Sequence, residues 1–285
     1  MDLESLALRV RRNENLPVLP QVATTVLKLV DDPRSSAKDL ERAIERDMAL
    51  ATKVLRVANS SYYGTSNVNS ISRAVSVLGL NTVRSLVVSI AYQQMVSGRS
   101  QSALFQRTNF WSHSLGVGIT SRVISKMLMP QKSEEMYLAG IMHDVGMLVL
   151  DRFLPEAFDQ AIRLCKERKI PMHEAEDEVL GFNHAQVGGL LAEQWGLSKA
   201  IANAIQFHHS PEMDDQTPDL TCMVALANTL AHQAGLQNHF AGTLELNSYA
   251  LAALSLTPEQ LEVIGVVMVQ EVMKAQQAFQ IQIAA

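Results

Sequence analysis

Apolar positions recur along most of the chain with a helical period. Residues at i, i+4, i+7 and i+8 share one helical face, and a second apolar face follows Asn81, an expected helix N-cap. The two faces consist of Leu50, Val54, Val57 and Ala58, and then of Val83, Leu86, Val87 and Ile90. The sequence has neither a convincing alternating strand pattern nor an Asn-Gly hairpin signal. We therefore predict an all-α fold.

Capping residues mark two further helix starts. Ser36 with Asp39 is typical of a capping arrangement, and the segment 257–260, Thr-Pro-Glu-Gln, combines an N-cap, a proline at the first helical position and a capping-box partner. After the second start, the apolar face of the expected helix is Leu261, Ile264, Met268 and Val272.

Breaks in the helical pattern indicate how the chain is divided. They fall at residues 97–100, 129–133 and 210–218, and all eight histidines follow the first break. This asymmetry predicts two packed helical lobes. The expected ranges are an N-terminal lobe over 1–105, a histidine-bearing lobe over 106–240 and C-terminal helices over 241–285.

Composition narrows the class of protein. With 47% apolar and 19% charged residues, the chain can bury a sizeable core, and its net charge of −5 argues against general nucleic-acid binding. Two cysteines are too few for a disulfide framework. The N-terminus does not have the pattern of a secretory signal, and no run of about 18 apolar residues predicts membrane insertion. We expect a cytoplasmic protein.

The histidine-bearing lobe contains candidate metal ligands. Imidazole and carboxylate side chains together suit Fe, Mn, Zn or Ni, and such a set could hold one or two ions. A helix that ends before Ser210-Pro211 would let two adjacent imidazoles converge. The candidates are His113, His143, Asp144, His184, His208 and His209. A single histidine is more often a hydrogen-bonded structural residue, and we keep that interpretation for His173, His232 and His239.

The N-terminal half carries a family resemblance. It opens with Leu-Pro-x-Leu-Pro at 16–20, continues with an acidic helix ending in Asp47 and an Asn59-Ser60 pair, and includes the segment 74–79, Ala-Val-Ser-Val-Leu-Gly. These features closely resemble the HDOD domain, an HD-related output module of bacterial signalling proteins, and the resemblance runs from about residue 16 to about 235. It implies an HD-domain-like fold, signalling proteins as partners and a connection with cyclic di-GMP signalling.

The histidine-bearing lobe is similar to the wider HD superfamily of metal-dependent phosphohydrolases, including the HD-GYP phosphodiesterases. Two departures argue against hydrolysis of cyclic di-GMP, because Met147 replaces the expected lysine and Asn228 the last aspartate. The segment after His209 also lacks Gly-Tyr-Pro. We therefore assign no catalytic residue. The alternative is a metal-dependent phosphohydrolase acting on a (cyclic) nucleotide, with Lys126 or Lys132 as the substitute cation.

Polar and aromatic groups gather at one expected helix end in the N-terminal lobe. Asn59, Tyr62 and Tyr63 are predicted to contribute to a binding surface where the lobes meet, for a signalling protein or a nucleotide ligand. For Asn59 the alternative is a local structural role at a helix C-terminus, where Gly64 supplies the left-handed conformation.

Overall fold

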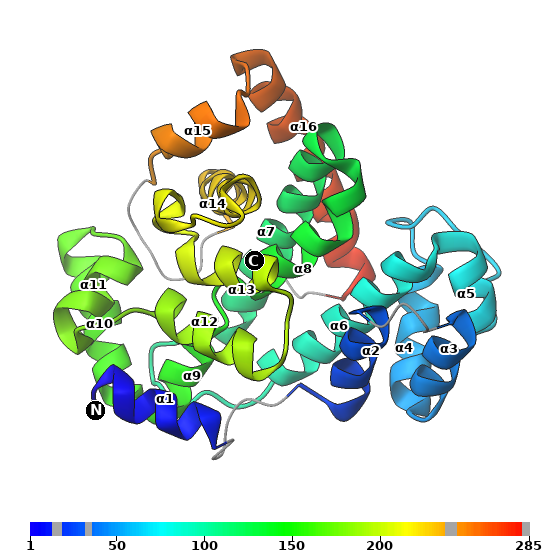
Figure 1. Cartoon of the computed structure of the whole chain (residues 1–285), viewed down its shortest axis with the longest axis horizontal. Helices are drawn as coiled ribbons and strands as arrows, with labels where there is room; N and C mark the ends of the chain where they lie inside the picture. Colours follow the sequence, from blue (N-terminus) through cyan, green and yellow to red (C-terminus); the bar gives the residue numbers. More distant parts are fainter. Residues whose placement is uncertain (13–18, 32–35, 237–243, 281–285) are drawn as a thin grey trace. The chain divides into compact units, whose positions relative to one another are not determined.

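The chain is helical throughout the part that the structure describes. The computed structural model describes residues 1–12, 19–31, 36–236 and 244–280, and no strand occurs within these ranges, which confirms the predicted all-α fold (Figure 1). The helices are α1 (Leu3–Arg11), α2 (Gln21–Asp31), α3 (Ala37–Glu45), α4 (Met48–Ala58), α5 (Ile71–Leu78), α6 (Leu80–Val96), α7 (Arg107–Leu128), η1 (Pro130–Lys132), α8 (Ser133–Met142), α9 (Gly146–Phe153), α10 (Pro155–Arg168), α11 (Met172–Leu180), α12 (His184–Gln194), α13 (Lys199–Phe207), η2 (Pro211–Met213), α14 (Pro218–Gln233), α15 (Ser248–Leu254) and α16 (Pro258–Ala278).

The helices form two compact units. Unit 1 comprises residues 1–17 and 98–269, and unit 2 comprises residues 18–97 and 270–285. The helix α1 therefore belongs to unit 1, although the predicted N-terminal lobe over 1–105 includes it. The division between the units falls inside α16. The predicted ranges 1–105, 106–240 and 241–285 stay a prediction about independent domains.

Unit 2 is built around α6. The helices α2 and α4 pack against α6, and α3 and α5 complete the cluster. Both apolar faces predicted for this half are buried: those of Leu50, Val54, Val57 and Ala58 on α4, and of Val83, Leu86, Val87 and Ile90 on α6.

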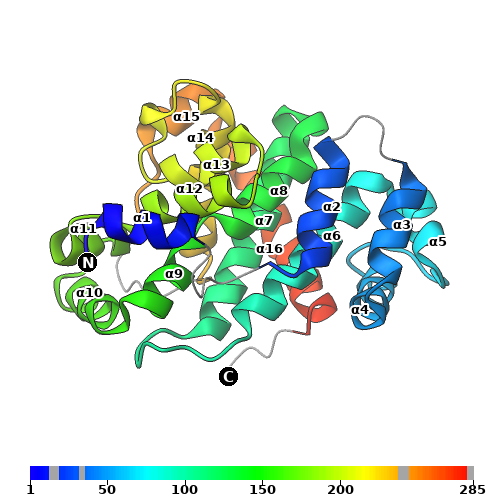
Figure 2. The same cartoon turned by 60° about the horizontal axis from the view of Figure 1, so that its bottom comes forward.

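Unit 1 is built around α7. This helix packs against α8 and α14, while α12 packs against α9 and α13. Figure 2 shows α1 alongside α12, which agrees with the contacts between these two helices. The ligand candidates of the second half all lie in this unit, and they are brought together by the contacts of α8 with α7 and α13 and of α12 with α9 and α13.

The helix starts were predicted with mixed success. Ser36 and Asp39 form the expected capping box of α3, and Thr257 and Gln260 exchange hydrogen bonds at the start of α16. The N-cap predicted at Asn81 is wrong, because α6 begins at Leu80. Its N-cap is Gly79, whose positive φ of 86° lets the chain turn directly from α5 into α6.

No single described helix is both long and apolar enough to cross a membrane, although α15 and α16 pass that test together as a pair bent by 100°.

Candidate metal centre

The His143-Asp144 pair lies in a tight turn between α8 and α9. The amides of Val145 and Met147 each donate a hydrogen bond three residues back, to the carbonyls of Met142 and Asp144, at 2.9 Å in both cases. Such bonds tighten the backbone relative to an α-helix. The turn places both side chains in the interior, with His143 fully buried and Asp144 3% exposed.

Gly146 allows this turn to approach α12. A Cβ atom at Gly146 would lie 1.9 Å from the carbonyl oxygen of His184 and 2.8 Å from the amide nitrogen of Gly188. Any side chain would therefore separate α9 from α12. The glycine after the His-Asp pair is thus a packing requirement that brings Asp144 to the first residue of α12.

Hydrogen bonds orient three of the imidazoles. In each ring Nδ1 lies within hydrogen-bond distance of a main-chain carbonyl oxygen, so Nδ1 is the donor and Nε2 is the nitrogen directed into the site. These contacts are His113 to Leu236 at 2.6 Å, His143 to Gly140 at 2.8 Å and His208 to Ile205 at 2.8 Å.

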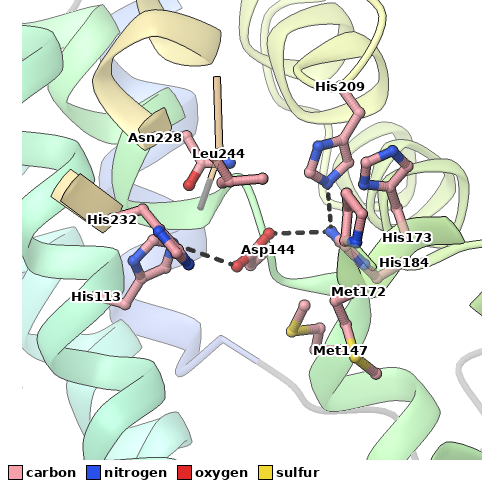
Figure 3. Close-up of a pocket in the computed structure, with 11 residues that line it drawn as sticks. His113, Asp144, Met147, Met172, His173, His184, His209, Asn228, His232 and Leu244 are labelled. Carbon is pink, nitrogen blue, oxygen red and sulfur yellow. Dashed lines mark hydrogen bonds and ion pairs between the residues drawn. The ribbon is translucent and has the colours of Figure 1, made fainter. Parts of the chain in front are cut away.

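The Nε2 atoms converge on the carboxylate of Asp144. Their distances to it are 3.2 Å for His143, 3.1 Å for His184, 3.5 Å for His208 and 3.6 Å for His113. His113 approaches Oδ2, whereas the other three approach Oδ1. Asp144 therefore has imidazoles on two sides, which Figure 3 shows for His113 on one side and His184 on the other.

His209 extends the group on the His184 side. Its Nε2 lies 3.0 Å from Nε2 of His184, and its ring stacks on that of His173 with centroids 3.9 Å apart. Because α13 ends at Phe207, as expected before Ser210-Pro211, the adjacent rings of His208 and His209 both turn inward.

Four of the candidate ligands, His113, Asp144, His184 and His209, line a cavity of about 40 Å³. One water molecule needs roughly 10–15 Å³ of such space, so the cavity has room for an ion with a few small ligands. It is lined by His113, Asp144, Met147, Pro171, Met172, His173, His184, His209, Asn228, His232 and Leu244 (Figure 3).

The cavity is also lined by two histidines that were interpreted from the sequence as structural residues. His173 comes from α11 and His232 from α14, the helix that also carries Asn228. Neither belongs to a motif that could have marked it in the sequence. His239 lies outside the described residues.

The electrostatics of the cavity favour cation binding. Burial raises the pKa of Asp144, but His143 and His184 outweigh burial and hold that pKa well below 3.8. Burial lowers the pKa of His113 and of His208 to about 4 in each case. At neutral pH Asp144 is therefore ionised, and His113 and His208 are neutral, which are the forms that bind metal ions.

His184 differs from these imidazoles. Burial lowers its pKa, but the carboxylates of Glu176 and Asp144 outweigh burial and raise it to about 10. Its Nδ1 lies 2.5 Å from Oε2 of Glu176, a fully buried residue of α11 that the sequence analysis missed. A proton on His184 offsets the charge of one of these two carboxylates.

The donor set fits a metal ion. The buried Nε2 atoms of His143 and His208 both face the Asp144 carboxylate, at 3.2 Å and 3.5 Å. Asp144 belongs to two groups of residues, and within each group the ligand atoms all lie within 4.8 Å of one another. One group is Asp144, His184, His208 and His209, and the other is Asp144, His113 and His143. All six candidates from the sequence thus lie together, and each group could hold one ion.

The predicted substitute cations are not at the cavity. Lys126 is exposed, and Nζ of Lys132 bonds to Glu135 at 2.7 Å; neither residue lines the cavity. Met147 does line it and is 4% exposed. Among the described lining residues there is accordingly no lysine or arginine.

The candidate binding residues of unit 2 lie after the end of α4. The Asn59 amide donates to the carbonyls of Leu55 and Val68 and accepts from the Val68 amide, so it anchors the following loop. Tyr62 and Tyr63 are half-buried and pack edge to face. Their part in binding stays a prediction.

The fold and the site together define a class of all-helical proteins in which buried imidazoles surround one aspartate. A comparison with known families identifies the family within that class. An HDOD domain matches residues 16–211 of the chain. The chain therefore belongs to the HDOD family.

Solved structures share the fold over almost the whole chain. An HDOD domain protein of unknown function from Geobacter sulfurreducens is 25% identical, with a TM-score of 0.77 and coverage of 98% of this chain and 97% of its own. A protein from Shewanella amazonensis SB2B, named as an inferred phosphohydrolase, is 24% identical with a TM-score of 0.75, covering 96% and 98%. A protein from Marinobacter aquaeolei VT8, named as an inferred signal transduction protein, is 23% identical with a TM-score of 0.78, covering 98% and 65%.

A curated relative from Treponema pallidum (strain Nichols), itself uncharacterised, is 27% identical over 220 residues. The match covers 76% of this chain and 42% of the relative, so the chain spans less than half the length of that protein.

Proposed function

We propose that this chain is a signal-transduction module of bacterial HDOD type whose His/Asp centre binds one or two divalent ions among Fe, Mn, Zn and Ni. The observation that carries the proposal is the convergence of the Nε2 atoms of His143, His184 and His208 on one oxygen of the buried Asp144 carboxylate, at 3.2, 3.1 and 3.5 Å. Imidazole nitrogens gathered around an ionised carboxylate are the type of donor set that these divalent ions bind.

The ligands divide into two groups around Asp144. His184, His208 and His209 would hold one ion, and His113 and His143 the other. A bound ion supplies a concentrated positive charge and Lewis acidity in the interior of unit 1. The chain's own contribution is to hold three imidazoles in fixed orientations through their bonds to Leu236, Gly140 and Ile205.

Metal analysis of the purified protein, followed by calorimetric titration of the metal-free protein with Mn²⁺ or Zn²⁺, tests this proposal. We expect stoichiometric binding by the unaltered protein and its loss in Asp144→Asn. The matched control is Asp159→Asn, which removes another buried carboxylate, one that is bonded to Ser102 and belongs to neither ligand group. Equal binding by Asp144→Asn and the unaltered protein would refute the assignment.

The signalling part of the proposal is supported by family membership and by the name of the Marinobacter relative. The partner would be another signalling protein, and Tyr62 and Tyr63 are the proposed contact residues. Alanine at either tyrosine should weaken capture of such a partner from a bacterial lysate without lowering the melting temperature by more than a few degrees. Normal binding by both variants would exclude this surface.

The second candidate function is a metal-dependent phosphohydrolase. The name of the Shewanella relative and the complete set of histidines favour it. Three features oppose it for cyclic di-GMP: Met147 replaces a cation, Asn228 replaces an acid, and pockets for such ligands usually measure about 300–1,000 Å³, against about 40 Å³ here.

A double variant separates the two candidates. Met147→Lys with Asn228→Asp restores a phosphate-binding charge and an acidic ligand together. We expect the unaltered protein, loaded with Mn²⁺, to hydrolyse neither cyclic di-GMP nor a generic phosphodiester at an appreciable rate. Robust turnover by the unaltered protein would establish the hydrolase, and turnover only by the double variant would support the signalling module.

A further inference from the structure

Glu176 is a buried acid with no place in the ligand groups. It lies on α11, is 0% exposed, and its Oε2 accepts two hydrogen bonds from the same residue: from Nδ1 of His184 at 2.5 Å and from the His184 backbone amide at 2.8 Å. The amide is the first of α12, where the positive end of the helix dipole favours a negative charge. The carboxylate is therefore held against His184 from two directions.

This contact distinguishes His184 from other candidate ligands. The rings of His113, His143 and His208 have Nδ1 on neutral main-chain carbonyls. A carboxylate that accepts from Nδ1 fixes the tautomer and makes the opposite nitrogen a stronger electron donor, and removing such a group typically lowers metal affinity about 10–100-fold. The two ligand groups that share Asp144 are thus unequal.

We propose that Glu176 is a positioning residue for His184 and that it makes the His184, His208 and His209 group the first to bind an ion. The inference rests on the proposed metal centre. It adds the order in which the two groups of ligands bind an ion: the group that contains His184, the partner of Glu176, binds an ion more tightly than the His113 and His143 group.

The alternative is a purely structural role, in which Glu176 only caps α12. Under that alternative its removal would lower the stability of the metal-free protein and leave metal affinity unchanged. Glu176→Gln tells the two apart, because the amide oxygen can still accept both hydrogen bonds while the negative charge is lost. Glu174→Gln is the matched control, since Glu174 lies on the same helix and is exposed.

The experiment is a titration of the metal-free full chain with Mn²⁺ by calorimetry and with Co²⁺ by visible absorption. In Glu176→Gln the dissociation constant of the tightest event should rise about 10–100-fold, with a changed Co²⁺ spectrum. Glu174→Gln should match the unaltered protein, and His113→Gln should leave the tightest event in place. Should Glu176→Gln fail to fold, Glu176→Asp, which keeps the charge but is one methylene shorter, should weaken the same event.

Two other outcomes have separate meanings. Unchanged tight binding in Glu176→Gln, or weaker tight binding in His113→Gln than in Glu176→Gln, would overturn the role of Glu176. Absence of binding by the unaltered protein would instead overturn the metal centre itself, so the two failures are distinguishable.

Discussion

Gly146 shows how a residue without a side chain determines the geometry of the centre. In Gly146→Ala the new methyl would overlap the carbonyl of His184, at 1.9 Å, and neither backbone could move without shifting α9 from α12. We expect the free energy of unfolding to fall by about 1–3 kcal/mol or more, as in other overpacked sites. Metal affinity should fall too, because Asp144 would move away from Nε2 of His184. Denaturant unfolding and Mn²⁺ titration measure the two effects.

Gly265 provides the control for this substitution. It lies within α16, and a Cβ atom there would meet nothing within 4 Å. Gly265→Ala should stabilise the protein by about 0.5–1 kcal/mol, because alanine loses less backbone entropy in a helix. Equal effects of the two substitutions would mean that Gly146 is not a packing requirement.

The ligands were predictable from the sequence to the extent that they belong to motifs. His143-Asp144 and His208-His209 are recognisable as pairs, and the helix break at Pro211 indicated why the second pair converges. Glu176 and His173 were missed because their role depends on where α11 lies relative to α12 and α13, and no local pattern encodes that. Only the packing of helices shows that a lone buried acid supports a ligand.

At the scale of helices, Asp214 joins α13, which leads to His208, to α14, which carries Asn228. Its carboxylate accepts from Asn203 on α13 at 2.7 Å and from Thr221 on α14 at 2.5 Å, and also from the Thr217 amide at 3.1 Å. Asp214 is 2% exposed. Replacement by asparagine should cost about 1.5–3 kcal/mol of unfolding free energy at pH 7, the usual range for hydrogen bonds to a charged group.

The pH dependence of this effect has a definite sign. Burial raises the pKa of Asp214, but the hydrogen bonds from Thr221, Thr217 and Gln216 outweigh burial and leave it below 3.8. A lowered pKa in the folded state contributes stability above the unfolded-state value, about 3.9, and that stability is lost as the pH falls through the folded-state pKa. The difference between the unaltered protein and Asp214→Asn should therefore be constant from pH 7 to about 5 and shrink below about 4. Urea unfolding at several pH values measures it, and a difference that persists unchanged at pH 2–3 would contradict the assignment.

The helix elements themselves were largely readable from the sequence. Periodic apolar faces and the capping residues Ser36 and Thr257 gave the right helices because these signals act within one or two turns. The start of α6 was misplaced because Asn81 has good N-cap chemistry, whereas Gly79 determines the turn through its backbone conformation. Local polar chemistry is a weaker constraint there than the permitted φ angle.

At the scale of the whole molecule, metal binding should stabilise unit 1 through mass action. An ion that binds only the folded state adds RT ln(1 + [ion]/Kd), about 2.7 kcal/mol at one hundred times the dissociation constant. Both tryptophans, Trp111 on α7 and Trp195 at the end of α12, are buried in this unit and lie on helices that carry His113 and His184. Tryptophan fluorescence therefore reports unfolding of the unit that holds the centre, whereas far-ultraviolet circular dichroism reports the helices of both units. We expect Mn²⁺ to raise the fluorescence-detected melting temperature by several degrees in the unaltered protein and not in Asp144→Asn. A shift of equal size in Asp144→Asn would show that the ion acts elsewhere.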